Sequence, residues 1–356
     1  GRPSQKVIKA LERAQESGSV DMYRAVHAAA LHGALERYTM VPGAQIQTFA
    51  GLNDLFDILA KTFIKDQASV IIAGPTTDYF KSYAENYGGI IAFNYAPSPF
   101  SSDPDGLIEK AAGNRCVIYL ASPNYPTGTT YGNDEIRMIL EGCGESMIIV
   151  DESYFEYYDQ TAVELVKRYE NLIVVRSFSE AFGLAGYPCA YIITSPKNIS
   201  EMNRHRHNGP SDATQIAAVA AISDLTDLRE RIETTRESMA YLAVRLRQFG
   251  LSCRMTPTNV LLLQVAESSQ VASILRRNNI FAEDVGFVPQ LENYVALTVS
   301  NPAAAHKVVE TFENISESVY RFKPAKIKKV TLHRTVEETA VGDRIPHMHN
   351  ESAGGK

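Results

Sequence analysis

The feature that most constrains the fold is an alternation of short apolar runs and helical stretches between residues 68 and 194. The runs are rich in Val and Ile, as buried strands are, and the intervening stretches are long enough for crossover helices. Strands joined by such crossovers pair in parallel, and helices then cover both faces of the sheet. The expected strands are Ser69–Ala73, Ile90–Phe93, Cys116–Ala121, Met147–Val150, Leu172–Arg176 and Tyr191–Thr194. We therefore predict an α/β fold with a mostly parallel sheet between helices.

The rest of the chain divides into smaller units on either side of this pattern. Apolar residues at helical spacing predict two helices before residue 40 and a long charged helix at about 226–250. Strands and helices then mix up to about residue 322, where the chain turns polar and loses its periodicity. We predict N-terminal helices in residues 1–40, a large domain in 41–225, a small α+β domain in 226–322, and a tail or linker in 323–356.

Composition excludes several classes of partner. The net charge of -6 and the pI of about 5.8 provide no basic surface for nucleic acid or an anionic membrane. No apolar run approaches the roughly 20 residues that cross a bilayer, and residues 1–20 lack the apolar middle of a signal peptide. The four cysteines show no Cys-x-x-Cys spacing, which favours free thiols over a disulfide or a metal site. A cytoplasmic protein is expected.

One stretch, Val174–Pro188, identifies a family. Its sequence, VVRSFSEAFGLAGYP, resembles the segment of class I and II aminotransferases at which a strand ends beside pyridoxal phosphate, in the histidinol-phosphate aminotransferase branch. Ser122–Gly128 (SPNYPTG) and Asp151–Tyr154 (DESY) resemble two further motifs of the same family. The resemblance covers about residues 3–320. It implies fold type I of the pyridoxal-phosphate enzymes, with a seven-stranded sheet, a small second domain and a homodimer.

The resemblance also assigns roles to residues. It implies that Asp151 pairs with the pyridine nitrogen of the cofactor and that Tyr154 shares the phenolic oxygen with residue 125. It implies that Phe80 stacks on the ring. The phosphate would meet backbone amides at a helix N-terminus and two hydroxyls, which are supplied by Gly51, Leu52, Asn53, Ser177 and Ser179.

Several positions depart from the family pattern. Glu180 stands where the family has the lysine that forms the Schiff base, and Pro188 stands where an arginine binds the phosphate. Tyr125 replaces the asparagine that hydrogen-bonds the phenolic oxygen, and Ala296 falls at the arginine that binds the substrate carboxylate. A tyrosine that reaches the partner subunit is replaced within Gly18-Ser19-Val20. A carboxylate cannot form a Schiff base, so these changes together predict the loss of transamination.

Three functions remain open from the sequence. The first is an aminotransferase-like protein that is non-catalytic or repurposed, possibly as one domain of a larger polypeptide. The second is an enzyme, an aminotransferase or lyase, that binds pyridoxal phosphate without a covalent bond and acts on an amino acid or amino phosphate. The third keeps the pocket for a different anionic ligand.

Overall fold

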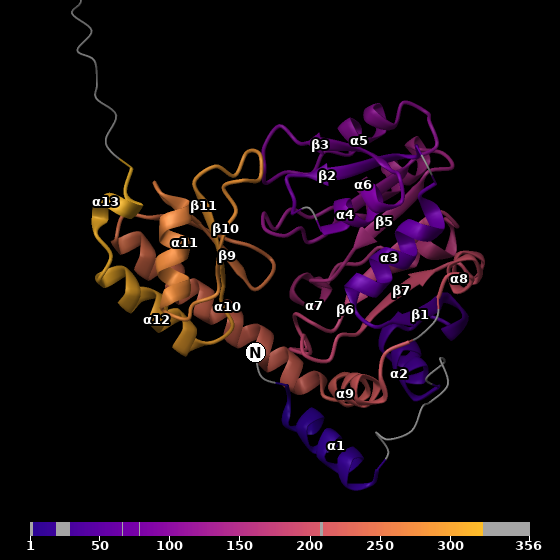
Figure 1. The fold of residues 1–356 in the computed structure, drawn as a ribbon, viewed down its shortest axis with the longest axis horizontal. Coiled ribbons are helices and arrows are strands. Elements are labelled where there is room, and N and C mark those ends of the chain that lie inside the picture. Colours follow the sequence, from indigo (N-terminus) through magenta and orange to yellow (C-terminus); the bar gives the residue numbers. More distant parts are fainter. Residues whose placement is uncertain (1–2, 19–28, 66, 78, 207–208, 323–356) are drawn as a thin grey trace, which may run out of the picture. The chain divides into compact units, whose positions relative to one another are not determined.

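The larger of two sheets has seven strands in the order β1-β7-β6-β5-β4-β2-β3 (Figure 1). The structure, a computed structural model, describes residues 3–18, 29–65, 67–77, 79–206 and 209–322. The strands are β1 (Ile46–Phe49), β2 (Ser69–Gly74), β3 (Ile90–Tyr95), β4 (Val117–Ala121), β5 (Met147–Asp151), β6 (Leu172–Ser177) and β7 (Ala190–Thr194). Strands β3, β2, β4, β5 and β6 pair in parallel, whereas β7 is antiparallel to β6 and β1. The predicted mostly parallel sheet is confirmed.

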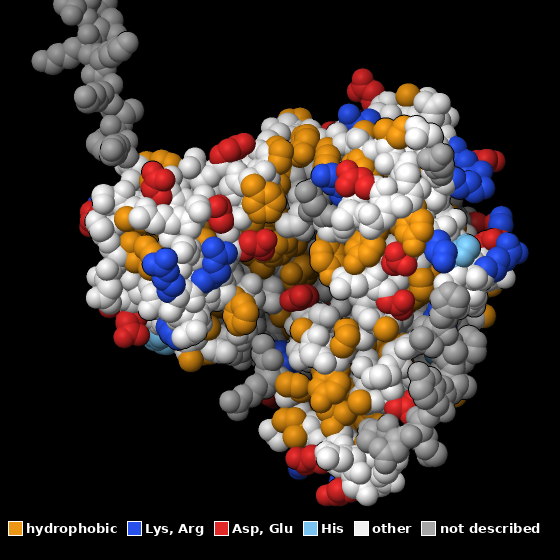
Figure 2. Space-filling view, viewed as in Figure 1, with side chains coloured by type: hydrophobic (Ala, Val, Ile, Leu, Met, Phe, Trp, Pro, Cys, Tyr) orange, Lys and Arg blue, Asp and Glu red, His pale blue; other side chains and the backbone are white. Residues whose placement is uncertain are grey.

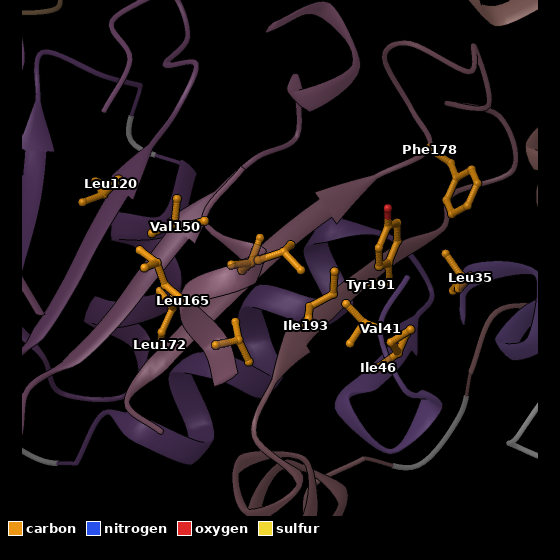
Figure 3. Close-up of a cluster of buried hydrophobic side chains, with 14 of the residues drawn as sticks. Leu35, Val41, Ile46, Leu120, Val150, Leu165, Leu172, Phe178, Tyr191 and Ile193 are labelled. Carbon is orange, nitrogen blue, oxygen red and sulfur yellow. The ribbon is translucent and has the colours of Figure 1, made fainter. Parts of the chain in front are cut away.

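Helices cover both faces of this sheet because its strands are apolar on both sides. In β5, Ile148 and Val150 belong to one core, while Ile149 belongs to the core on the opposite face. Figure 3 shows part of the first core, including Val150 and Leu172. The helices are α1 (Gln5–Glu16), α2 (Ala29–Thr39), α3 (Leu52–Phe63), α4 (Tyr79–Asn86), α5 (Pro104–Ala111), α6 (Asn133–Gly142), α7 (Phe155–Tyr158), α8 (Pro196–Asn203) and α9 (Asp212–Ile222), with short 3-10 turns at Gly43–Gln45 and Val163–Lys167.

A smaller antiparallel sheet follows, in the order β10-β11-β9-β8. Its strands are β8 (Ser252–Met255), β9 (Val260–Gln264), β10 (Ala282–Asp284) and β11 (Tyr294–Thr298), and its helices are α11 (Ser268–Arg277), α12 (Pro302–Glu313) and α13 (Glu317–Tyr320). The helix α12 starts with a proline, where the missing N–H is not needed, behind the side-chain cap of Asn301. This second sheet lies within the region where strands and helices were expected to mix, although its two short strands β8 and β10 were not predicted.

The long helix α10 (Leu225–Gln248) contributes side chains to both cores. Near its start, Leu228 and Ile232 pack in the core of the large sheet. Near its end, Met239 and Leu242 pack in the core of the small sheet. One helix therefore connects the two hydrophobic cores.

Some predictions fall outside the described residues. These are part of the second helix expected before residue 40, most of the Gly18-Ser19-Val20 segment and the whole tail 323–356. Among the described helices, none combines the length and apolar composition that crossing a bilayer requires. The four cysteines are free thiols, as predicted, and Cys253 is the least buried of them.

An ion pair is buried where β5 and β6 end. Arg176 donates from Nε to the Oε2 atom of Glu152 at 3.0 Å, and the side chains of the two residues are 4% and 2% exposed. The guanidinium also donates to Thr161 Oγ1 at 2.8 Å and lies 3.5 Å from the centre of the Phe155 ring. This cluster ties β6 to the turn after β5, and so helps to position the residues that follow both strands.

Candidate ligand cavity

A cavity of about 440 Å³ lies at the carboxyl ends of β4 and β5 and reaches the small sheet. Parallel strands end at the same edge of a sheet, so residues that are far apart in sequence meet there. Its lining residues are Leu52, Thr76, Thr77, Tyr79, Tyr119, Ala121, Pro123, Tyr125, Asp151, Ser153, Tyr154, Glu180, Glu283 and Thr298. Figure 2 shows a hollow between the two sheet-bearing regions in which hydrophobic side chains gather. Of the predicted site residues, five line the cavity: Leu52, Tyr125, Asp151, Tyr154 and Glu180.

Asp151, the last residue of β5, is held by donors from the protein itself. Its Oδ1 accepts from the backbone N–H of Ser153 at 2.9 Å and from the Ser153 hydroxyl at 2.5 Å. Its Oδ2 accepts from the Tyr119 hydroxyl at 2.7 Å. Burial raises the pKa of Asp151, and these three hydrogen bonds oppose that rise because they stabilise the carboxylate. The side chain is therefore fixed in place on the cavity wall.

Glu180 follows β6 and also lines the cavity. Its Oε2 accepts one long hydrogen bond, at 3.4 Å, from the side-chain amide of Asn259. Burial raises the pKa of Glu180, since the surrounding protein solvates the carboxylate less well than water does. The sequence did not indicate Asn259, which comes from the small-sheet part of the chain, just before β9.

Tyr125 joins the large sheet region to the small sheet. Its hydroxyl donates to Glu283 Oε2 at 2.5 Å, and its ring packs against a small-sheet hydrophobic cluster that contains Ala296. Glu283 on β10 pairs directly with Ala296 on β11, which is 2% exposed. Side chains at directly opposite positions share one face of a sheet. The position at which an arginine was expected is thus apolar and lies beside a carboxylate.

The structure corrects the expectation for Phe80. Its side chain is 1% exposed and stacks on Tyr119, with ring centroids 4.7 Å apart, inside the core between the sheet and α3. The neighbouring Tyr79 lines the cavity instead and is 48% exposed. Successive residues of a helix point about 100° apart, so only one of two adjacent aromatics can face the cavity.

The residues expected around a phosphate make contacts within the protein. Gly51 has φ 94, and a Cβ built on it would come within 2.8 Å of the Pro188 Cβ atom. The Ser177 hydroxyl oxygen accepts from the backbone N–H of Ser179 at 3.0 Å. Asn53 Oδ1 accepts from the Tyr79 hydroxyl at 2.6 Å. Of the five residues expected at the phosphate, only Leu52 lines the cavity, whereas Gly51, Asn53, Ser177 and Ser179 do not.

Two further lining residues had no clear signal in the sequence. Tyr119 lies in an apolar strand, so its sequence context predicts a core residue. In the structure its hydroxyl donates a hydrogen bond to Asp151. Glu283 belongs to a three-residue strand far along the chain, and only the folded structure brings it to Tyr125. Both residues act through contacts that depend on tertiary structure.

We expect Tyr119→Phe to lower the free energy of unfolding by about 1.5–3 kcal/mol, because a buried carboxylate loses a hydrogen-bond donor. Urea unfolding measures this change. The matched control is Tyr169→Phe, which removes an exposed hydroxyl from Glu141 and should leave the free energy of unfolding nearly unchanged. Equal losses in the two variants would contradict a structural role for the Tyr119–Asp151 contact.

Comparison with known proteins identifies the family. The family described as aminotransferase class I and II matches residues 1–312. The chain belongs to the class I and II aminotransferase family. It is 30% identical, over 319 residues, to the histidinol-phosphate aminotransferase of Methanococcoides burtonii, covering 88% of this chain and 87% of that protein. It is 29% identical, over 287 residues, to a dihydroxyacetone phosphate transaminase of Campylobacter jejuni, covering 78% of each.

Solved structures agree with this assignment at the level of the fold. The histidinol-phosphate aminotransferase of Sinorhizobium meliloti, solved in complex with pyridoxal-5'-phosphate, superposes with a TM-score of 0.79 at 21% identity and covers 88% of each chain. An aspartate aminotransferase of Thermus thermophilus gives 0.76 at 17% identity. The fold is therefore fold type I of the pyridoxal-phosphate aminotransferases.

The residues of this cavity do not fit the family's cofactor in its covalent form. Of the described residues, those that line the cavity include no lysine, arginine or histidine, so they provide neither an amine for a Schiff base nor a cation for a phosphate. Three carboxyl side chains line it instead, those of Asp151, Glu180 and Glu283. Pro188 is packed against Gly51 on the side expected to hold the phosphate. We derive no reaction step through pyridoxal phosphate.

Proposed function

We propose that this chain is a class I and II aminotransferase-family protein that has lost transamination and serves as a non-catalytic or repurposed ligand-binding domain. One observation carries the proposal. Glu180, at the position where the resemblance implies the Schiff-base lysine, is on the wall of a cavity that no described lysine lines. The aldehyde of pyridoxal phosphate condenses with an amine, and a carboxylate has no nitrogen with which to condense.

Neighbouring lysines do not offer a substitute. Lys167 and Lys197 flank Glu180 in the sequence, and both are exposed and absent from the cavity wall. Lys197 lies 3.5 Å from Glu170 instead. The same amine would act as the base that moves a proton during transamination, so one substitution removes two functions.

The other departures from the family pattern support the same conclusion. Pro188 offers no charge to a phosphate, and Ala296 offers none to a substrate carboxylate. Tyr125 stands at the asparagine position, and its hydroxyl donates a hydrogen bond to Glu283 instead. By the resemblance, position 188 would contact the cofactor phosphate, position 125 the phenolic oxygen and position 296 the substrate carboxylate. The lost contacts are therefore spread over the whole cofactor–substrate complex.

A second candidate function is an enzyme that binds pyridoxal phosphate without a covalent bond. It is favoured by Asp151 and Tyr154, which line the cavity where the resemblance implies contacts to the pyridine ring. Its substrate would be an amino acid or amino phosphate, as the names of the relatives suggest. The third reading, a pocket for another anionic ligand, has little support because carboxylates, and no cations of the described residues, line the cavity.

The proposal includes the state of assembly. We propose a homodimer in the cytoplasm, as the family resemblance implies for the dimer. Light scattering on the purified full chain measures the dimer directly, and a monomer at micromolar concentration would count against it.

Titration with pyridoxal phosphate separates the first two candidates. We expect the purified chain to show no new band in the near-ultraviolet to visible range beyond that of free cofactor, and no band shift on adding an amino acid. Borohydride reduction followed by mass spectrometry should find no phosphopyridoxyl group on the chain. A cofactor band that shifts with an amino donor, or turnover of any such donor, would favour the second candidate and remove the first.

A further inference from the structure

Among the described residues, no lysine, arginine or histidine lines the cavity beside its carboxylates. Asp151 receives its hydrogen bonds from Tyr119 and Ser153, which are neutral. Glu180 receives one from Asn259, and Glu283 receives one from Tyr125. Throughout the described part of the chain, neither glutamate forms an ion pair with a lysine or an arginine. Carboxylates that line a cavity without a cation attract a positively charged ligand and repel an anion.

Aromatic rings complete the walls around these carboxylates. Tyr79, Tyr119, Tyr125 and Tyr154 all line the cavity. Burial raises the pKa of Tyr79, Tyr125 and Tyr154, and the nearby charge of Glu180 contributes to the rise in each case. Glu180 and these three tyrosines line the same cavity. The face of an aromatic ring attracts an organic cation, and rings grouped around a carboxylate form a common binding arrangement for amines.

An unpartnered acceptor beside Glu180 points to a missing donor. Asn259 is 6% exposed, and its side-chain nitrogen faces Glu180. The oxygen of the same amide is buried and accepts no hydrogen bond from the described residues. Buried polar atoms normally have partners, so the hydrogen bonding beside Glu180 is incomplete among the described residues. Glu180 accepts only this one long hydrogen bond from them, and a protonated primary amine brings three N–H donors.

We propose that this cavity binds a small organic diamine or polyamine, with one ammonium group at Glu180 and a second at Glu283. Its volume of about 440 Å³ falls within the range of small-molecule sites, about 300–1,000 Å³. Tyr125 links the two glutamates. It donates a hydrogen bond to Glu283, and the charge of Glu180 contributes to the raised pKa of Tyr125. The inference rests on the proposed function, since a chain without covalently bound pyridoxal phosphate leaves this cavity to another ligand.

The test compares four-carbon ligands that are positively charged, neutral and negatively charged. The full chain is titrated by calorimetry at neutral pH and moderate salt with 1,4-diaminobutane, 1,4-butanediol and succinate, and spermidine is added as a longer cation. We expect the diamine and spermidine to bind with one-to-one stoichiometry. The neutral diol and the dianion should bind at least tenfold more weakly than the diamine.

Isosteric variants locate the site. Glu180→Gln and Glu283→Gln each remove one charge from the cavity wall, and we expect each to weaken diamine binding about tenfold or more. The control is Glu145→Gln, which removes the same charge from an exposed position outside the cavity and should change affinity less than twofold. Circular dichroism confirms that each variant is folded.

Three results would overturn the inference. They are no binding of either amine, binding of succinate as tight as that of the diamine, and equal losses in the control and cavity variants. The last result would mean that the amines bind the acidic surface as a whole. None of these results depends on the reduction experiment with pyridoxal phosphate, so the inference and the proposed function can fail separately.

Discussion

The triple variant Glu180→Lys/Tyr125→Asn/Pro188→Arg is expected to form a covalent adduct with pyridoxal phosphate that the unchanged chain does not form. The lysine supplies the amine that condenses with the aldehyde, and the arginine supplies a bidentate cation for the phosphate. The asparagine keeps a hydrogen-bond donor at position 125 while removing a ring that fills cavity space and contacts Glu283. The readout is a new absorption band, followed by borohydride reduction and a mass increase of one phosphopyridoxyl group.

Two further variants make this result interpretable. Glu180→Lys alone should bind the cofactor much more weakly than the triple variant, because the phosphate still faces Pro188 and no added cation. Glu180→Met/Tyr125→Asn/Pro188→Arg has the same restored surroundings without the amine, and reduction should leave its mass unchanged. If Glu180→Lys alone matched the triple variant, Tyr125 and Pro188 would not be obstacles, and the cavity would be closer to an active enzyme than we propose.

The sequence predicted those strands and helices whose apolar residues follow a regular local pattern. The strands β4, β5 and β6 are runs of apolar residues that are buried on both faces, so a simple run of Val, Ile and Leu predicts them. Strand β1 lacks this pattern, since Gln47 and Thr48 occupy two of its four buried positions. Polar residues inside a strand look like a loop until their partners in the folded protein are known.

The site was predictable where a motif follows a strand, and unpredictable where distant segments meet. Asp151 is the last residue of β5 and Glu180 follows the end of β6, and both line the cavity. Glu283 contacts Tyr125 across 158 residues of sequence, and no local pattern marks it. The choice between Tyr79 and Phe80 depended on the rotation of α4, which adjacent aromatic residues do not reveal.

Arg176→Met is expected to lower the free energy of unfolding by about 3–5 kcal/mol, the largest stability change that we predict. The substitution keeps a side chain of similar length but removes the charge that faces Glu152, whose side chain is 2% exposed. A buried carboxylate would then have lost its cation, and only the hydrogen bonds from Thr161 and the Ala162 backbone would remain to it. Guanidinium unfolding followed by circular dichroism measures the loss.

An exposed ion pair and a double variant separate charge from packing. Arg137→Met breaks the pair with Asp134, in which the side chains are 43% and 89% exposed, and should cost no more than about 1 kcal/mol. Arg176→Met/Glu152→Gln removes both buried charges and should recover part of the stability lost in Arg176→Met, since no uncompensated carboxylate remains at position 152. If the double variant were less stable than Arg176→Met, the main role of Arg176 would be its packing on Phe155, at 3.5 Å, rather than its charge. Strand β5 ends at Asp151 and β6 is followed by Glu180, so this cluster stabilises two strand ends that position residues of the cavity wall.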